Sequence, residues 1–204
     1  MTTIIDYGLG NIKAFVNLFE RLSLPIKIAK CAEDVRNSTK IILPGVGSFD
    51  YAMTQFNNSG MRDAVENKVF GSDTPVLGIC VGMQMLASGS EEGKLPGLGW
   101  IEGYVRMFDG NTIPYKSKLP HMGWNSISPK EHYPLMNGLN NTSRFYFLHS
   151  YYFVSANENE IMSTTLYGNL FTSSIAKRNI FGIQFHPEKS HLNGITLLKN
   201  FALL

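Results

Sequence analysis

Cys80 is the residue of this 204-residue chain whose surroundings best suit nucleophilic chemistry. It stands in Gly78-Ile79-Cys80-Val81-Gly82, between a short apolar run and a segment of helical character. A nucleophile in such a strand-to-helix turn forms an elbow, in which small flanking residues permit a sharp backbone bend. A helix that begins directly after the cysteine also favours the thiolate, the reactive form. The alternative is a cysteine that only packs in the core, because free cysteines are among the most buried residues.

A cysteine nucleophile requires a base, and His186-Pro187-Glu188 provides a candidate. In an extended segment residues two apart face the same side, and a proline biases the preceding residue toward extended geometry. Glu188 can then orient the imidazole while His186 takes the thiol proton, which is the division of roles in a catalytic triad. The alternative is a surface loop after an edge strand, since these residue types are common in turns.

The remaining histidines are weaker candidates. His121 can be a surface or interface residue, and His149 can line a pocket or satisfy a core hydrogen bond. His132 and His191 lie in polar contexts and are expected to be solvated. Because no pair has the spacing and the cysteine or carboxylate support of a zinc site, we predict no metal and no cofactor.

Strands and helices that could position these residues alternate in the first half of the chain. Apolar spacing predicts helices at 10–24 and 61–70, and short apolar or β-branched runs predict strands at 2–8, 25–30, 40–49 and 74–79. The run at 40–49 breaks into a glycine-rich loop. Such alternation predicts right-handed βαβ units and a mostly parallel sheet covered on both faces.

After Gly93 the runs become short, aromatic or β-branched, which predicts a strand-rich, partly antiparallel half. Residues 193–204 return to helical spacing. The expected fold class is therefore α/β: a three-layer sandwich with a mostly parallel central sheet, helices on both faces and an antiparallel strand-rich C-terminal half. Without a visible linker or repeat, residues 1–204 are expected to form a single domain, with an irregular segment at about 103–120.

Composition narrows the classes of function. The chain is 44% hydrophobic and 17% charged with a formal charge of +2, and its 18 Lys and Arg are scattered, which argues against nucleic-acid binding. No window approaches 18 uninterrupted apolar residues, so no membrane partner is expected. Two cysteines are too few for a disulfide framework, and with no basic leader at the N-terminus we expect a cytoplasmic protein.

Six sequence blocks resemble the class I (triad) glutamine amidotransferases, in family order along almost the whole chain. They are DYGLGNI at 6–12, LPGVGSF at 43–49, GICVGMQ at 78–84, LPHMGWN at 119–125, FLHSYY at 147–152 and GIQFHPEKS at 182–190. The nucleophile and His-Pro-Glu blocks are typical of the whole family. The DYGLGNI, PGVG and PHMGWN blocks are similar to the subfamily of glutaminase subunits that serve imidazole glycerol phosphate synthesis in histidine biosynthesis.

The resemblance implies a specific chemistry. Cys80 attacks the carboxamide of L-glutamine to form a thioester, and His186, oriented by Glu188, protonates the departing ammonia and then activates water. The oxyanion is held by the backbone N–H of Val81 and by that of Val46 or Gly47. Val81 replaces the leucine usual in the family, a mild change because the backbone acts there. Gln84, one helical turn after Cys80, and four residues matched by position are implied to bind glutamine: Glu92, His149, Ser150 and Tyr151.

The resemblance also implies a partner, because ammonia released into solvent would be wasted. Such subunits form a heterodimer with a (β/α)8 cyclase, and the implied interface residues are Asn11, Pro120, His121, Met122, Trp124 and Asn125. Two alternatives remain open. The same chemistry can serve an amidotransferase that aminates surface polysaccharide sugars, or the chain can be a catalytically idle regulatory subunit, although an idle protein has no need for Cys80, His186 and Glu188 together.

Overall fold

The computed structural model describes residues 1–116, 118–130 and 132–204 and is organised around one large mixed sheet. Five strands at its centre and one edge are parallel, in the spatial order β2 (Ile26–Ala29), β1 (Thr2–Ile5), β3 (Lys40–Gly45), β4 (Val76–Cys80) and β12 (Ile180–Ile183). The sheet then continues antiparallel through β11 (Asn169–Lys177), β10 (Ile161–Tyr167) and β7 (Ser128–Pro129).

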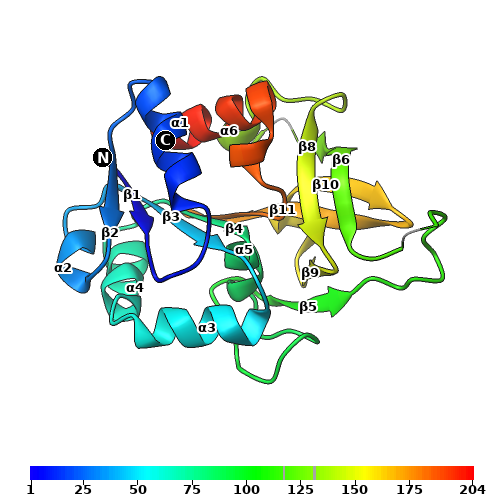
Figure 1. Cartoon of the computed structure of the whole chain (residues 1–204), viewed down its shortest axis with the longest axis horizontal. Helices are drawn as coiled ribbons and strands as arrows, with labels where there is room; N and C mark the ends of the chain where they lie inside the picture. Colours follow the sequence, from blue (N-terminus) through cyan, green and yellow to red (C-terminus); the bar gives the residue numbers. More distant parts are fainter. Residues whose placement is uncertain (117, 131) are drawn as a thin grey trace.

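Helices cover the parallel part of the sheet on both faces (Figure 1). On one face lie α1 (Ile12–Arg21) and the C-terminal helix α6 (His191–Leu203), with the two chain termini close to them. On the other face lie α2 (Ala32–Val35), α3 (Phe49–Asn58), α4 (Arg62–Gly71) and α5 (Val81–Met85). The three-layer α/β class and the antiparallel C-terminal half are therefore confirmed.

Burial explains why the central strands read as uninterrupted apolar runs. Ile41, Ile42 and Leu43 of β3 are fully buried, as are Val76 and Leu77 of β4. A parallel strand between two helical layers has no solvent face and needs no alternation of polar residues.

Two strand pairs extend from the antiparallel half. Strands β6 (His121–Ser126) and β8 (Arg144–His149) form a separate two-stranded ribbon, and β5 (Gly103–Met107) pairs with β9 (Tyr151–Ser155). Since β8 ends at His149 and β9 begins at Tyr151, the chain passes from the ribbon to the main sheet at Ser150. The described residues also include three short 3-10 helices: η1 (Pro134–Met136), η2 (Glu158–Glu160) and η3 (Pro187–Lys189).

Two expectations from sequence need correction. Residues 103–107 of the segment expected to be irregular form strand β5, because Val105 is buried and pairs with Phe153. Helices α2 and α3 were not predicted at all. None of the helices in the described part of the chain combines the length and apolar character needed to cross a membrane.

Candidate active site

Cys80 lies at the carboxyl end of β4, where the backbone turns sharply into α5. It is a non-glycine residue with φ +56° and ψ −113°, a conformation that is strained and that clusters at functional sites. A Cβ added to Gly78 would lie 2.6 Å from the carbonyl oxygen of Gly82, and one added to Gly82 would lie 2.1 Å from that of Leu43. The two flanking glycines are thus needed for the close approach of β3, β4 and α5, which the elbow interpretation predicts.

His186 and Glu188 form a buried pair beside Cys80. The Nδ1 atom of His186 lies 2.9 Å from Oε1 of Glu188, and both side chains are at most 4% exposed. Burial by itself would lower the pKa of His186, but hydrogen bonds to Cys80 and Glu188 and the electrostatic interactions with these two residues outweigh it and raise the pKa. Because Nδ1 is engaged with Glu188, Nε2 is the ring nitrogen that can exchange a proton with Cys80.

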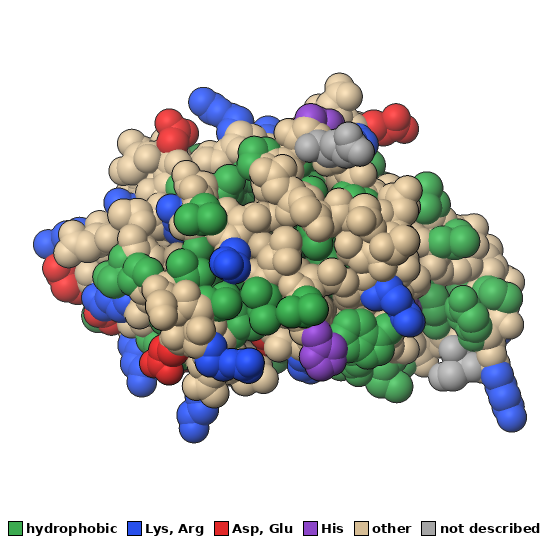
Figure 2. Space-filling model, turned by 90° about the horizontal axis from the view of Figure 1, so that it is seen from above, with side chains coloured by type: hydrophobic (Ala, Val, Ile, Leu, Met, Phe, Trp, Pro, Cys, Tyr) green, Lys and Arg blue, Asp and Glu red, His purple; other side chains and the backbone are tan. Residues whose placement is uncertain are grey.

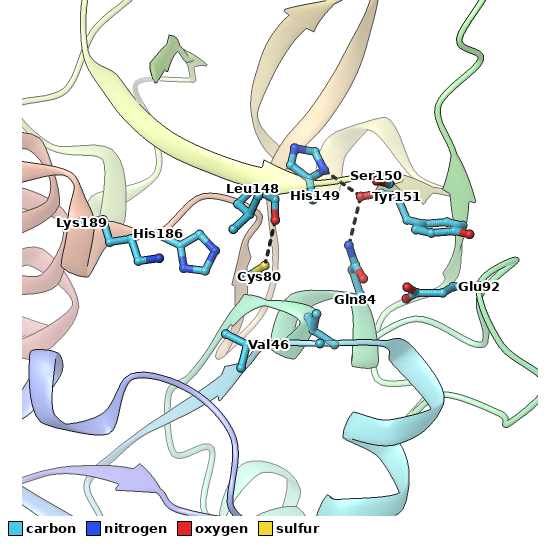
Figure 3. A pocket seen from close by; sticks show the side chains of 12 residues that line it. Val46, Cys80, Gln84, Glu92, Leu148, His149, Ser150, Tyr151, His186 and Lys189 are labelled. Atoms are coloured by element: carbon cyan, nitrogen blue, oxygen red, sulfur yellow. Dashed lines mark hydrogen bonds between the residues drawn. The ribbon is translucent and has the colours of Figure 1, made fainter. Parts of the chain in front are cut away.

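Two further polar groups contact the sulfur of Cys80. Its Sγ donates to the carbonyl oxygen of Leu148 at 3.9 Å (Figure 3). The amide Nε2 of Gln184 donates to Sγ at 3.7 Å. Gln184 is fully buried. Gln184 was not among the predicted site residues, although it lies two residues before His186 on an extended segment, a spacing that puts both side chains on one face.

The sulfur opens into a cavity of about 160 Å³. Its lining includes every residue expected to act on glutamine except Glu188, which lies behind His186: Val46, Gly47, Cys80, Val81, Gln84, Glu92, His149, Ser150, Tyr151 and His186. Leu148 and Lys189 also line it and were not predicted. Residues from five separate parts of the chain therefore meet at one small site.

The PGVG loop forms the wall of the cavity across from Leu148 (Figure 3). Val46 is exposed there, and Gly47 has φ +92°, a value that favours glycine. Residues of the DYGLGNI block contact Pro44 at the start of the loop. The hydroxyl of Tyr7 donates to the carbonyl oxygen of Pro44, and a Cβ added to Gly10 would lie 2.7 Å from the Cβ of Pro44. The DYGLGNI block thus packs against the loop that carries the expected oxyanion donors.

Gln84 and Glu92 present polar groups from the other end of the cavity. The Nε2 atom of Gln84 donates to the carbonyl oxygen of Tyr151 and to Oε1 of Gln184, both at 3.0 Å, and its own carbonyl oxygen lies on the side of Glu92 (Figure 3). The Glu92 carboxylate accepts from the backbone N–H of Phe49 at 2.9 Å. Burial raises the pKa of Glu92, although the hydrogen bond from Phe49 acts to lower it.

The residues expected at a partner interface divide into exposed and buried ones. Met122 is 65% exposed and Trp124 38%, while Pro120 is exposed and Asn125 half-buried. With Tyr115 and Tyr167 they line a second cavity of about 380 Å³. Asn11 is exposed, and its side chain caps α1 by accepting from Ala14.

His121 was also expected at the partner interface, but it is buried inside the chain. It is only 3% exposed, stacks between Phe147 and Tyr167, and points its Nδ1 atom at His149. Its ring is used for contacts within this chain because the β6–β8 register places it opposite His149.

Sequence comparison agrees with the class of site that this geometry defines. Residues 3–204 match the family model described as glutamine amidotransferase class-I, so the chain belongs to that family. A solved structure described as a glutamine amidotransferase superposes with a TM-score of 0.76, covering 100% of this chain and 99% of its own at 18% identity. At 18% identity, this superposition shows that the two chains share a fold and nothing more specific.

Closer relatives are found among curated sequences. The protein of Bdellovibrio bacteriovorus named "Imidazole glycerol phosphate synthase subunit HisH" is 52% identical over 204 residues, covering 99% of each chain. The protein of the same name from Leptospira interrogans is 47% identical over 204 residues, covering 100% of each.

Proposed function

We propose that this chain hydrolyses L-glutamine to glutamate and ammonia and delivers the ammonia to a cyclase that makes imidazole glycerol phosphate and 5-aminoimidazole-4-carboxamide ribotide. The proposal rests mainly on the buried set of Cys80, His186 and Glu188 at one side of a cavity that Gln84 and Glu92 also line. The names of relatives at 52% and 47% identity over the full chain support the histidine-biosynthesis partner.

In the first half-reaction Cys80 gives its thiol proton to Nε2 of His186 and acts as the nucleophile. Its sulfur forms a bond to the carboxamide carbon, and the carbonyl oxygen becomes an oxyanion that the backbone N–H groups of Val81 and of Val46 or Gly47 stabilise. The His186 imidazolium then gives its Nε2 proton to the amide nitrogen. The C–N bond breaks, ammonia leaves, and a glutamyl thioester remains on Cys80.

In the second half-reaction water attacks the thioester. Neutral His186 removes a proton from the water through Nε2, and the C–S bond breaks to release glutamate and regenerate Cys80. Glu188 stabilises each imidazolium state of His186 and holds Nδ1 as its donor, as the carboxylate of a triad does. The raised pKa of His186 suits a group that must hold a proton until the leaving ammonia takes it.

The α-amino and α-carboxylate groups of glutamine are proposed to bind at the end of the cavity that lies away from His186. The carboxylate of Glu92 and the carbonyl oxygen of Gln84 are acceptors suited to an α-ammonium group. The junction at Ser150 and Tyr151, beside His149, supplies polar backbone groups suited to the α-carboxylate.

A cyclase partner is proposed to dock over the mouth of this cavity and form a heterodimer. Met122 of β6 pairs directly with Leu148 of β8, both side chains are exposed, and Leu148 also lines the active-site cavity. Figure 2 shows hydrophobic side chains gathered across the middle and toward the right of one face of the molecule. Exposed Met and Trp side chains are typical anchors of protein interfaces, which favours Met122 and Trp124 with Pro120, Asn125 and Asn11 nearby as contacts. We also propose that residues 1–204 act as one domain in the cytoplasm.

The experiment mixes the purified chain with glutamine and measures glutamate release with and without a histidine-pathway cyclase and its nucleotide substrate. Strong stimulation by the loaded cyclase is expected. If the chain releases glutamate but does not bind the cyclase, the acceptor is a different amidotransferase, such as one that aminates polysaccharide sugars. If no partner elicits glutamate release, the catalytic proposal is wrong and a regulatory role is favoured.

A further inference from the structure

A continuous chain of hydrogen bonds runs from the ribbon β6–β8 to the active-site cavity. The side-chain Nδ2 of Asn125 lies 3.2 Å from Nε2 of His121, and Nδ1 of His121 lies 3.0 Å from Nε2 of His149. Nδ1 of His149 in turn lies 2.7 Å from the carbonyl oxygen of Tyr151. That oxygen also accepts from Gln84, whose Nε2 group bonds to Gln184.

Each bond in this chain has only one possible direction. Burial lowers the pKa of His121 to about 4. Burial also lowers the pKa of His149 to about 3, and electrostatic repulsion from His121 and His186 acts in the same direction. The hydrogen bond to Tyr151 raises this pKa but does not outweigh them. Both rings are therefore neutral near pH 7 and each carries a single N–H.

The carbonyl oxygen of Tyr151 can only accept, so His149 must carry its proton on Nδ1. Its Nε2 is then an acceptor and needs the Nδ1–H of His121. This leaves Nε2 of His121 as an acceptor for the amide of Asn125. The orientation of that amide is fixed independently, because Nδ2 also donates to the carbonyl oxygen of Leu166 at 2.9 Å and Oδ1 accepts from the N–H of Ser126 at 2.8 Å.

We propose that His121 is a positioning residue for glutamine binding, although it is not among the residues that line the cavity. With Asn125 it forms a relay of fixed direction that keeps His149 in its Nδ1–H tautomer. That tautomer holds the carbonyl of Tyr151, and the two acceptors Tyr151 and Gln184 fix the amide of Gln84 with its oxygen toward Glu92. The inference rests on the proposed glutaminase function and adds the residues that preorganise its substrate pocket.

Two substitutions of His121 separate hydrogen bonding from packing. His121→Phe keeps an aromatic ring between Phe147 and Tyr167 but removes the donor to His149. His121→Asn places an amide N–H near the position of Nδ1 and keeps that donor. His132→Phe, at an exposed histidine remote from the relay, is the matched control.

The measurement is kcat and KM for glutamine in the complex with the cyclase, together with the ¹⁵N shifts of His149 in the full chain. We expect His121→Phe to raise KM about tenfold, as loss of one buried hydrogen bond would, with kcat within about threefold of wild type. His121→Asn should keep KM within about threefold of wild type, and the control should match wild type. A wild-type KM in folded His121→Phe, or equal impairment of the Asn and Phe variants, would overturn the relay.

Asn125→Asp tests the direction of the relay without altering the buried rings. An aspartate offers only acceptors to His121, which must then protonate Nε2, so His149 is forced to the opposite tautomer. The same rise in KM and an Nε2–H signal from His149 are expected, and an unchanged tautomer would contradict the relay. If wild type releases no glutamate, the proposed function fails, whereas the relay is still decided by the tautomer of His149 in wild type and in Asn125→Asp.

Discussion

Replacement of Cys80 by alanine is expected to lower kcat for glutamate release by at least about 10⁴-fold, the scale of loss when a triad nucleophile is removed. No other side chain that lines the cavity offers a thiol. Alanine keeps a Cβ in the strained elbow and adds no bulk, so the fold should be retained. The measurement is glutamate release in the presence of the cyclase, with circular dichroism and the unfolding midpoint to confirm the fold.

Cys31→Ala is the matched control, because Cys31 is the other free cysteine and lies exposed on the surface. Its activity should equal that of wild type. Near-normal turnover by a folded Cys80→Ala protein would show that another group performs the attack and would remove the basis of the proposed mechanism.

Glu188→Gln is expected to lower kcat about 10² to 10⁴-fold, by analogy with amide replacement of a triad carboxylate. Glutamine retains the size of the side chain but loses the negative charge, and its amide can donate to Nδ1 of His186. His186 then holds the wrong tautomer and cannot use Nε2 as a base. Glutamate release by the complex measures this loss.

The same substitution should change the pH profile of kcat/KM. Since the hydrogen bond and charge of Glu188 help to raise the pKa of His186, their removal lowers that pKa. The imidazolium that protonates ammonia is then lost at lower pH, so the basic limb of the profile moves down the pH scale. A basic limb that stays in place, or moves up, would mean that Glu188 does not tune His186. Glu33→Gln, at an exposed glutamate paired with Arg36 on the surface, should leave rate and profile unchanged.

The nucleophile elbow and the His-Pro-Glu pair were predictable because each depends on local geometry. Gly78 and Gly82 flank Cys80 within five residues, and Pro187 fixes the relation of His186 to Glu188. Local residue types were enough to specify how these backbones turn. The strands between helices were predictable for a similar reason, since burial on both faces leaves a continuous apolar run.

Contacts between distant segments depend on how the strands pair, which local residue types do not specify. Gln184 reaches Cys80 because β12 lies parallel beside β4, with Gly182 opposite Gly78, a pairing across about a hundred residues. His121 was expected at an interface because it belongs to the PHMGWN block together with Met122 and Trp124, but the register of β6 against β8 turns it inward.

Helix α3 was missed for a different reason. Phe49, Ala52, Met53 and Phe56 have helical spacing and are buried, but the segment follows a glycine-rich loop and contains several polar residues. The apolar stripe is present in the sequence, but the polar residues between its members and the preceding loop weaken its helical pattern.

The most direct test of the central claim is to trap the covalent intermediate. The complex is mixed with glutamine, quenched with acid within one turnover and digested, and peptides are examined by mass spectrometry. The account predicts a glutamyl thioester on the peptide that contains Cys80, absent from Cys80→Ala and labile to hydroxylamine. Glutamate release with no adduct on Cys80 in a quench that preserves thioesters, or an adduct on Cys31 instead, would contradict it.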